Sequence, residues 1–494
     1  MNIDEHKPSL KKNFILSFII QMICYISPLI ASPYLTRVLG AESIGVYSFS
    51  YSYAHYFILF ASFGFTNYGT MIISENRADL DRRNTLFWSL LCSRIIFALV
   101  SLSIYLGIVL ANGFVGIENN KLMFVFSILI ISAAIDFTFF FRGIEKLNLI
   151  SFATALTNVL YLLSIFLFVK SENDLLLFTI LKTLSTSLIN VFLIPFLHKR
   201  IGKPNVNKKD FLSIIIGSFS FFLPSLVMGI STALDQTLIG IFSNNVQVAY
   251  YQQTSKITAL LSAILYAAST VILSRSSLLN YEDKDDTNVK ALVAKSIILC
   301  FFILSPVVAG LYLVGNMFIP LYFGLEFASA VATFFWLLPV AIASSFSSVI
   351  IAAYYYPHRK TMSVTIIVTI SIIINVALTI IFLLSTNLEA VAAAIGSLIA
   401  EVFVTSVLFF KARSVLSFKS VWKDLTKIFA SIIVMCTVIF SLNYFLLNDR
   451  LSPIFIILLD TFIGGFIYAT MLLILKESTF NMCITMVKSK ILKR

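Results

Sequence analysis

The residues of this sequence with the most informative chemistry are polar side chains that interrupt long apolar segments. Asp235 and Glu401 are acidic and able to hold a proton or a metal cation. Asn375, in the middle of another apolar segment, would add an oxygen ligand. Because charges at membrane depth are costly, those that remain tend to mark cavities or functional sites. We therefore take these three as candidate cation-coupling residues, although for Asn375 alone a hydrogen bond between helices is the simpler interpretation.

Four basic residues lie in or beside apolar segments in the same way: Arg37, Arg94, Lys182 and Lys256. Arg94 and Lys182 lie deeper in their segments, which favours a place in a polar cavity. For Arg37 and Lys256, an interfacial side chain that reaches toward the lipid headgroups is an equally good interpretation.

Tyrosines gather around Tyr47 and around Tyr251, and His55 and several serines accompany the first group. Aromatic faces stack against sugar rings, whereas a single tyrosine at a membrane interface needs no other explanation. The grouping favours a hydrated cavity, so Tyr47 and Tyr251 join the four basic residues as candidate substrate-binding residues.

Sequence signatures of enzymes and metal sites are missing. The chain has no GxxxxGK[ST] loop and no HExxH helix, and its four histidines and five cysteines are scattered. We therefore expect no catalytic residue, metal site or cofactor, and transport driven by a proton or sodium gradient or by substrate release. The net charge of +12 does not indicate a nucleic-acid partner, because basic residues gather in the loops of membrane proteins that stay in the cytoplasm.

The elements that must position these residues are transmembrane helices. Of 494 residues, 59% are hydrophobic and 12% charged, whereas soluble domains are about 45–50% apolar and about 25% charged. Blocks long enough to cross a bilayer predict an all-α integral membrane protein with about fourteen spans. The predicted spans are 13–33, 46–68, 86–111, 122–141, 149–169, 175–197, 211–233, 249–273, 291–314, 328–352, 362–384, 389–410, 428–447 and 453–475.

The charges of the loops between these spans predict an orientation. Alternate loops carry clusters of lysine and arginine, while the opposite loops receive only Arg37, Lys121, Lys170 and Arg450. Since cytoplasmic loops are the basic ones, both termini are predicted to be cytoplasmic. The first apolar run is too long for a signal-peptide core, so we expect a retained first helix.

An internal repeat is predicted from the starts of the first and seventh spans. Each passes a proline, reaches a polar turn closed by Gly40 or Gly240, and continues into a tyrosine-rich helix. The predicted organisation is a six-helix half at 1–197, a basic cytoplasmic linker at 198–210, a second six-helix half at 211–410, and a basic loop, two additional helices and a tail at 411–494. Parallel repeats of this kind are a transporter design with the substrate path between the halves.

Several motifs resemble those of the Wzx-type O-antigen and polysaccharide flippases, which belong to the MOP superfamily that includes the MATE exporters. They are PYLTRVLG at 33–40, FFFRGIEK at 139–146, LDQTLIG at 234–240 followed by Ala249-Tyr250-Tyr251, and the segments 270–275 and 319–324. The chain departs from the family pattern at Phe139, Arg142 and Ser274, where tryptophan, glutamine and proline are usual.

The resemblance implies a V-shaped MOP-type fold in the bacterial inner membrane. It implies a non-enzymatic flippase for undecaprenyl-diphosphate-linked oligosaccharide, an O-antigen or capsule repeat unit, which moves from the cytoplasmic to the periplasmic leaflet. Polymerase and chain-length proteins are the implied partners besides membrane lipid. The cationic candidates would hold the diphosphate, and Asp235 would sense the coupling H⁺ or Na⁺ with Asn375 or Glu401.

Two other functions stay open at this point. A multidrug or toxin exporter of the same fold would prefer an acidic cavity, and this sequence offers several cationic candidates. A membrane polysaccharide polymerase usually carries a sizeable periplasmic loop, and every predicted outside loop here is short.

Overall fold

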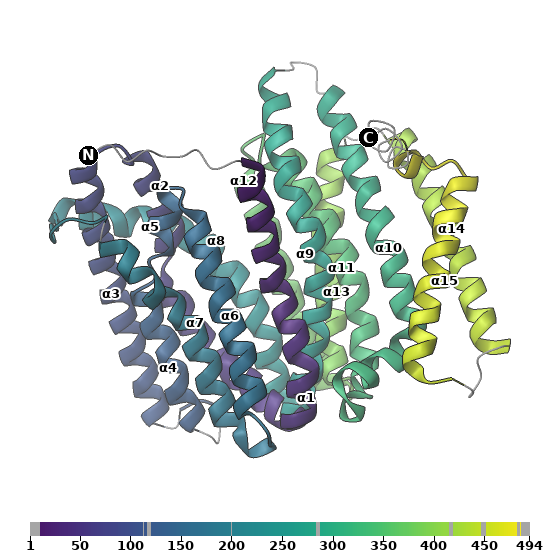
Figure 1. Ribbon diagram of the computed structural model, residues 1–494, viewed down its shortest axis with the longest axis horizontal. Helices are drawn as coiled ribbons and strands as arrows, with labels where there is room; N and C mark the ends of the chain where they lie inside the picture. The colour runs from purple at the N-terminus through teal and green to yellow at the C-terminus, as the bar shows by residue number, and fades with distance from the viewer. Residues whose placement is uncertain are drawn as a thin grey trace. The chain divides into compact units, whose positions relative to one another are not determined.

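Helices form all of the regular structure within the residues that the computed structural model describes (Figure 1). These residues are 10–111, 113–115, 120–198, 200–282, 287–413, 418–445, 451–481 and 485. Outside these residues lie Arg450 and most of the predicted tail after residue 481. The helices are α1 (Leu10–Ser62), α2 (Phe65–Glu75), α3 (Leu80–Leu110), α4 (Asn120–Ala134), α5 (Thr138–Gly143), α6 (Leu147–Phe168), α7 (Leu175–His198), α8 (Lys208–Phe242), α9 (Asn245–Glu282), α10 (Thr287–Phe323), α11 (Ala330–Ile350), α12 (Thr361–Ser385), α13 (Ala390–Ala412), α14 (Phe418–Phe445) and α15 (Pro453–Ile474), with short helical turns η1 (Glu172–Asp174), η2 (Leu325–Phe327) and η3 (Ile351–Tyr355).

The chain packs as two compact units, Met1–Ala249 and Tyr250–Arg494. In the first, α8 packs against α1, α2 and α3, so this helix lies with the helices that precede it. In the second, α13 packs between α11 and α12, and α14 and α15 pack against α10. The predicted division at 198–210 concerns the sequence repeat and stays a prediction.

The helices have the length and apolarity of membrane spans. Twelve segments within the described residues are long and apolar enough to cross a bilayer. One of them, Ile26–Glu75, has 50 residues, enough for two crossings. Since α9, with 38 residues, is a further long helix outside those twelve, the predicted count of about fourteen agrees with the structure.

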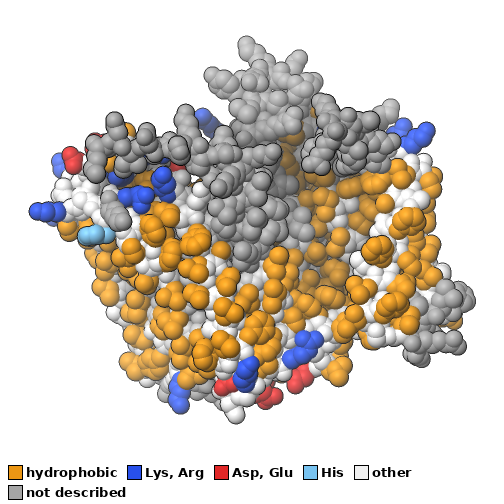
Figure 2. All heavy atoms as spheres, in the orientation of Figure 1, with side chains coloured by type: hydrophobic (Ala, Val, Ile, Leu, Met, Phe, Trp, Pro, Cys, Tyr) orange, Lys and Arg blue, Asp and Glu red, His pale blue; other side chains and the backbone are white. Residues whose placement is uncertain are grey.

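The surface of the helices is apolar where lipid would contact it. Leu99 of α3 is 56% exposed, Ile373 of α12 63% and Phe462 of α15 85%. Figure 2 shows hydrophobic side chains across the middle of the face that it draws, with Lys, Arg, Asp and Glu near its upper and lower edges. Side chains of this size exposed in such numbers fit a hydrocarbon solvent, because lipid imposes no cost on them.

Three breaks interrupt the helices of the first unit. Gly40, with φ of 73° and ψ of 171°, separates the two parts of α1 at the turn that the sequence predicts. Phe63 and Gly64, both with positive φ, separate α1 from α2, and residues 135–137 separate α4 from α5. The last two breaks fall inside predicted spans and were not expected.

The predicted turn at Gly240 is wrong. α8 runs without interruption through Pro224 and Gly240 and ends at Phe242. Gly240 serves close packing instead, since an added Cβ would lie 2.2 Å from the ring of Phe49. The sequence signal of a glycine after a polar run is therefore the same for two different purposes, a turn at Gly40 and a helix contact at Gly240.

Candidate functional site

An aromatic and cationic cluster lies inside the first unit and is built by α1, α4, α6 and α7. The ring of Tyr47 lies 4.9 Å from that of Phe178 and 5.6 Å from that of Phe126, centroid to centroid. Lys182 follows Phe178 by one helical turn, so the two share a face of α7. The Lys182 ammonium lies over the ring of Tyr161, 4.4 Å from its centroid.

Lys182 is half-buried, two turns from the start of α7. Within the part of the chain that the structure describes, no carboxylate forms an ion pair with it. The tyrosine ring stabilises the ammonium by a cation–π contact, which is weaker than a desolvated ion pair. A cation held in this way at membrane depth is available to an anionic group.

Asp235 is buried in the first unit, 5% exposed, next to a hydroxyl network on α8 and α1. Two residues further on, Thr237 donates to or accepts from Tyr56 at 2.8 Å and contacts Ser52 at 2.8 Å. On the same helix, Thr237 lies two residues after Asp235. Arg37 is exposed, and its guanidinium donates to the carbonyl of Pro33 at 3.0 Å.

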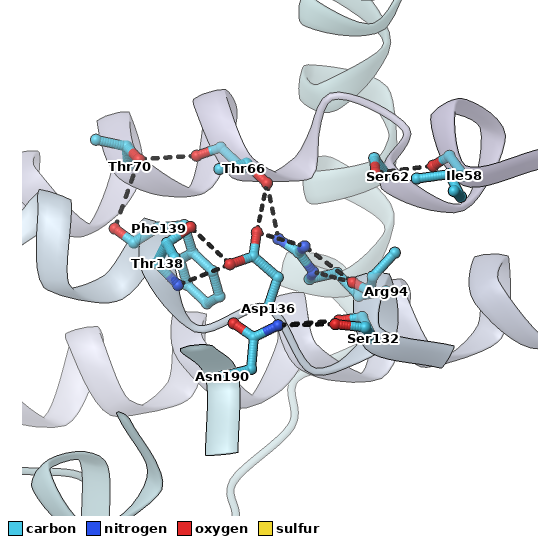
Figure 3. Close-up of polar contacts among 11 residues, drawn as sticks. Ile58, Ser62, Thr66, Thr70, Arg94, Ser132, Asp136, Thr138, Phe139 and Asn190 are labelled. Carbon is cyan, nitrogen blue, oxygen red and sulfur yellow. Dashed lines mark hydrogen bonds and ion pairs between the residues drawn. The ribbon is translucent and has the colours of Figure 1, made fainter. Parts of the chain in front are cut away.

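Arg94 is enclosed in the first unit at the point where the two unexpected helix breaks meet (Figure 3). Its guanidinium forms an ion pair with Asp136 at 2.9 Å and donates to the carbonyl of Ala133 at 2.9 and 3.2 Å. It also donates to the Thr66 hydroxyl at 3.2 Å and lies over the ring of Phe139. In this conformation the side chain holds protein groups and does not line an open surface.

Asp136 completes this polar junction. One carboxylate oxygen accepts from Arg94 and from the Thr66 hydroxyl at 3.0 Å. The other accepts from the backbone and the hydroxyl of Thr138, at 2.9 and 2.6 Å. The carboxylate of Asp136 thus accepts from the first N–H group of α5, which begins at Thr138. The sequence marked Arg94 as a candidate but did not predict its pairing with Asp136.

A polar strip runs along α13 in the second unit. Ser397, Glu401 and Thr405 follow one another at a spacing of four residues, so they share a helix face. At one end, the Tyr251 hydroxyl lies 3.0 Å from that of Ser397, and the amide of Asn375 donates to Ser397 at 3.4 Å. Three sequence candidates, Tyr251, Asn375 and Glu401, therefore lie on one strip.

Glu401 occupies the middle of this strip and contacts hydroxyl groups. Ser347 of α11 donates to Glu401 Oε1 at 3.0 Å and lies 2.7 Å from the hydroxyl of Thr405. Thr405 also donates to the carbonyl of Ala343 at 3.1 Å. Among the described residues no basic side chain forms an ion pair with Glu401. Its negative charge would thus be balanced by a proton or a bound cation.

The sequence candidates divide between the units. Tyr47 and Lys182 lie in the aromatic cluster of the first unit, and Tyr251, Asn375 and Glu401 lie on the α13 strip of the second. Lys256 is exposed on α9 and donates to Gln253 at 3.2 Å. Ser347, Ser397 and Thr405 were missed. The four-residue spacing of Ser397 and Thr405 around Glu401 was a signal available in the sequence, whereas Ser347 lies on another helix. Tyr161 and Phe178 were also missed, because both lie among apolar residues in the sequence.

Comparisons with known proteins match this architecture. A protein of Escherichia coli (strain K12) named "Putative O-antigen transporter" is 22% identical over 422 residues, 83% of this chain and 99% of the relative. A protein of the same name from Shigella dysenteriae is 22% identical over 334 residues, 65% of this chain and 79% of the relative.

Two solved structures share the fold. The lipid II flippase MurJ in an inward closed conformation aligns with a TM-score of 0.74 at 18% identity, covering 95% of this chain and 100% of that one. An inward-facing multidrug resistance MATE family transporter of the MOP superfamily aligns with a TM-score of 0.63 at 17% identity, covering 81% of this chain and 97% of that one. The predicted all-α, MOP-type membrane fold is confirmed.

The family model described as polysaccharide biosynthesis protein matches residues 10–279, more than half of the chain. The Wzx-type resemblance drawn from the sequence motifs is confirmed. The chain therefore belongs to the polysaccharide biosynthesis protein family.

Proposed function

We propose that this protein is a flippase that moves undecaprenyl-diphosphate-linked oligosaccharide from the cytoplasmic to the periplasmic leaflet of the bacterial inner membrane by alternating access. The observation that carries the proposal is Lys182, a cation at membrane depth whose ammonium faces Tyr161 and no carboxylate among the described residues. A diphosphate supplies the missing negative charge, and the surrounding rings offer faces for sugars. The polyprenyl tail remains in lipid.

Family membership supports this choice of cargo. Both relatives carry the name of an O-antigen transporter, and the MurJ structure with the same fold is that of a lipid flippase. The remaining cationic candidates, Arg37 and Lys256, are exposed, and we propose them as further contacts of the diphosphate. Arg94 would join them only in a conformation that opens its pair with Asp136.

The coupling ion acts on the acidic residues in this proposal. Glu401 accepts from the Ser347 hydroxyl and forms no ion pair among the described residues, and a proton or a sodium ion would neutralise it. Asn375 lies on the same strip, and Asp235 is the corresponding buried acid of the first unit. The loops rich in lysine and arginine face the cytoplasm, together with both termini, and polymerase and chain-length proteins are the proposed partners.

The test is complementation of a bacterium that lacks its own O-antigen flippase but makes the lipid-linked repeat unit. We expect this protein to restore surface polysaccharide and to remove the accumulated intermediate, and Lys182→Gln to do so poorly. Drug-resistance assays run in parallel address the multidrug alternative. Increased resistance to cationic drugs without restored polysaccharide would contradict the proposal and favour a multidrug exporter.

A further inference from the structure

We propose that α2 and α5 form one rigid two-helix body, hinged at membrane depth on the Arg94–Asp136 pair, that moves as a unit when the transporter changes state. This inference rests on the proposed alternating access and names Arg94 and Asp136 as positioning residues for it. All of the residues and contacts that support the inference lie within the first unit.

α2 and α5 are held together along their whole length. At the hinge end, Thr66 of α2 and Thr138 of α5 both donate to Asp136. At the opposite end, Arg77 and Glu145 form an ion pair at 2.6 Å. α2 and α5 share their largest interface with each other.

Close glycine packing joins the two helices between these ends. An added Cβ at Gly143 of α5 would lie 2.6 Å from the side chain of Ile73 and 3.1 Å from the carbonyl of Thr70, both on α2. An added Cβ at Gly69 of α2 would lie 2.9 Å from the ring of Phe139 on α5, as well as 2.7 Å from Leu90. Two helices in such close contact move together more readily than apart, because packed interfaces have discrete arrangements.

Both helices begin at a backbone break. Phe63 has φ of 36° and Gly64 φ of 71° before α2, and residues 135–137 leave the helical conformation before α5. Irregular backbone at membrane depth requires polar partners, and before α5 the guanidinium of Arg94 donates to the carbonyl of Ala133 while Asp136 accepts from the backbone N–H of Thr138. Hinge motions use a few residues of this kind at the ends of rigid elements.

Arg94 lies on α3, a helix of 31 residues that runs without a break. Arg94 donates to Thr66 at the start of α2 and to Ala133 and Asp136 at the break before α5 (Figure 3). One side chain on an unbroken helix therefore fixes both hinge points. The ion pair gives the body a pivot, while the flanking breaks allow it to turn.

The experiment measures distances between spin labels in proteoliposomes of the full chain with its native cysteines replaced. Cysteines at exposed Ser74 of α2 and Arg142 of α5 report on the body, and one at exposed Leu188 of α7 serves as the reference. Distances are recorded at acidic and alkaline pH, with and without undecaprenyl diphosphate. We expect the distance from Ser74 to Arg142 to stay in one narrow distribution, while both distances to Leu188 shift together.

Variants separate the hinge from general stability. Arg94→Gln is expected to broaden both distances to Leu188 and to remove their correlated shift, whereas Arg94→Lys retains the charge and part of the shift. Gly107→Ala on α3 is the matched control, because an added Cβ meets nothing within 4 Å there. Its distances should equal those of the parent protein.

A distance from Ser74 to Arg142 that changes as much as the distances to Leu188 would overturn the inference, and so would three distances that are constant in every condition. The measurement does not depend on cargo turnover. If both distances to Leu188 shift together in a protein that flips no lipid, the inference stands and the proposed function is contradicted. If the protein flips lipid while all three distances stay constant, the proposed function stands and the inference is contradicted.

Discussion

Asp136 and Glu401 are both acids within membrane spans, and their surroundings differ in one respect. Asp136 accepts from a guanidinium and three further donors. Glu401 accepts from a serine hydroxyl that is itself next to a threonine. The first acid is neutralised by the protein, and the second has no basic partner among the described residues.

The difference separates a group that fixes structure from a group that can change its state. A carboxylate paired with arginine keeps its charge and its position as long as the pair stays intact. A carboxyl group among hydroxyls gains or loses a proton, or binds a cation, without breaking an ion pair. The hydroxyls of Ser347 and Thr405 can adapt, since each donates or accepts by rotation.

The largest expected effect is on the paired acid. Arg94→Ala leaves the half-buried Asp136 without its cation, and breaking a buried pair costs about 3–5 kcal/mol. We expect a large fall in the thermal unfolding temperature in detergent. Removing both charges with Arg94→Gln and Asp136→Asn should recover much of the loss, because no unpaired charge remains. An unchanged unfolding temperature in Arg94→Ala would remove the contrast between the two acids.

The second effect is on the unpaired acid and concerns activity. Glu401→Gln keeps the shape and the hydrogen-bonding capacity of the side chain but cannot ionise. We expect flipping to fall on the order of a hundredfold, or ~2.7 kcal/mol, and to lose its dependence on the ion gradient, with an unfolding temperature close to that of the parent. Asp460→Asn, at another buried acid that contacts Asn443, is the control. Full, gradient-dependent flipping by Glu401→Gln would contradict the coupling role.

The third effect tests the packing beside the Arg94–Asp136 pair. Gly143→Ala places a methyl group 2.6 Å from Ile73, and overpacking of this kind costs about 1–3 kcal/mol. Unfolding in denaturant should show this loss, while Gly107→Ala should show none. Equal stability of the two variants would mean that α2 and α5 are less closely joined than the structure indicates.

The smallest effect is at Lys182. Lys182→Gln should weaken binding of undecaprenyl diphosphate about tenfold, or ~1.4 kcal/mol, because the cation is lost while Tyr161 remains. Lys182→Arg should bind close to normally. Lys256→Gln, at an exposed lysine, provides the comparison, and a loss there as large as at Lys182 would place the anion elsewhere.

The sequence was sufficient to predict the helices. Apolar length predicts a span because every backbone group must be paired inside the bilayer, and twelve segments within the described residues have that length and apolarity. The turn at Gly40 followed from its polar neighbours. Glu401 and Lys182 stood out because a charge in an apolar segment needs a reason.

The pairing of those residues could not be predicted. Arg94 and Asp136 lie on different spans, and only the packing of α3 against α4 brings them together. The breaks before α2 and α5 were hidden because Phe63 and Phe137 lie in stretches that are, taken over their whole length, apolar enough for a continuous span. Whether a buried charge is satisfied depends on tertiary contacts, so one sequence could not distinguish Asp136 from Glu401.

Whether the protein flips its proposed cargo is tested most directly in proteoliposomes that contain the purified protein and a fluorescent undecaprenyl-diphosphate-linked oligosaccharide. An impermeant quencher measures how much of the lipid lies in the outer leaflet while an ion gradient is imposed. We predict that the protein transfers the lipid between leaflets faster in the presence of the gradient, and that Glu401→Gln does not respond to it. Transfer no faster than in protein-free liposomes, with or without a gradient, would contradict the account.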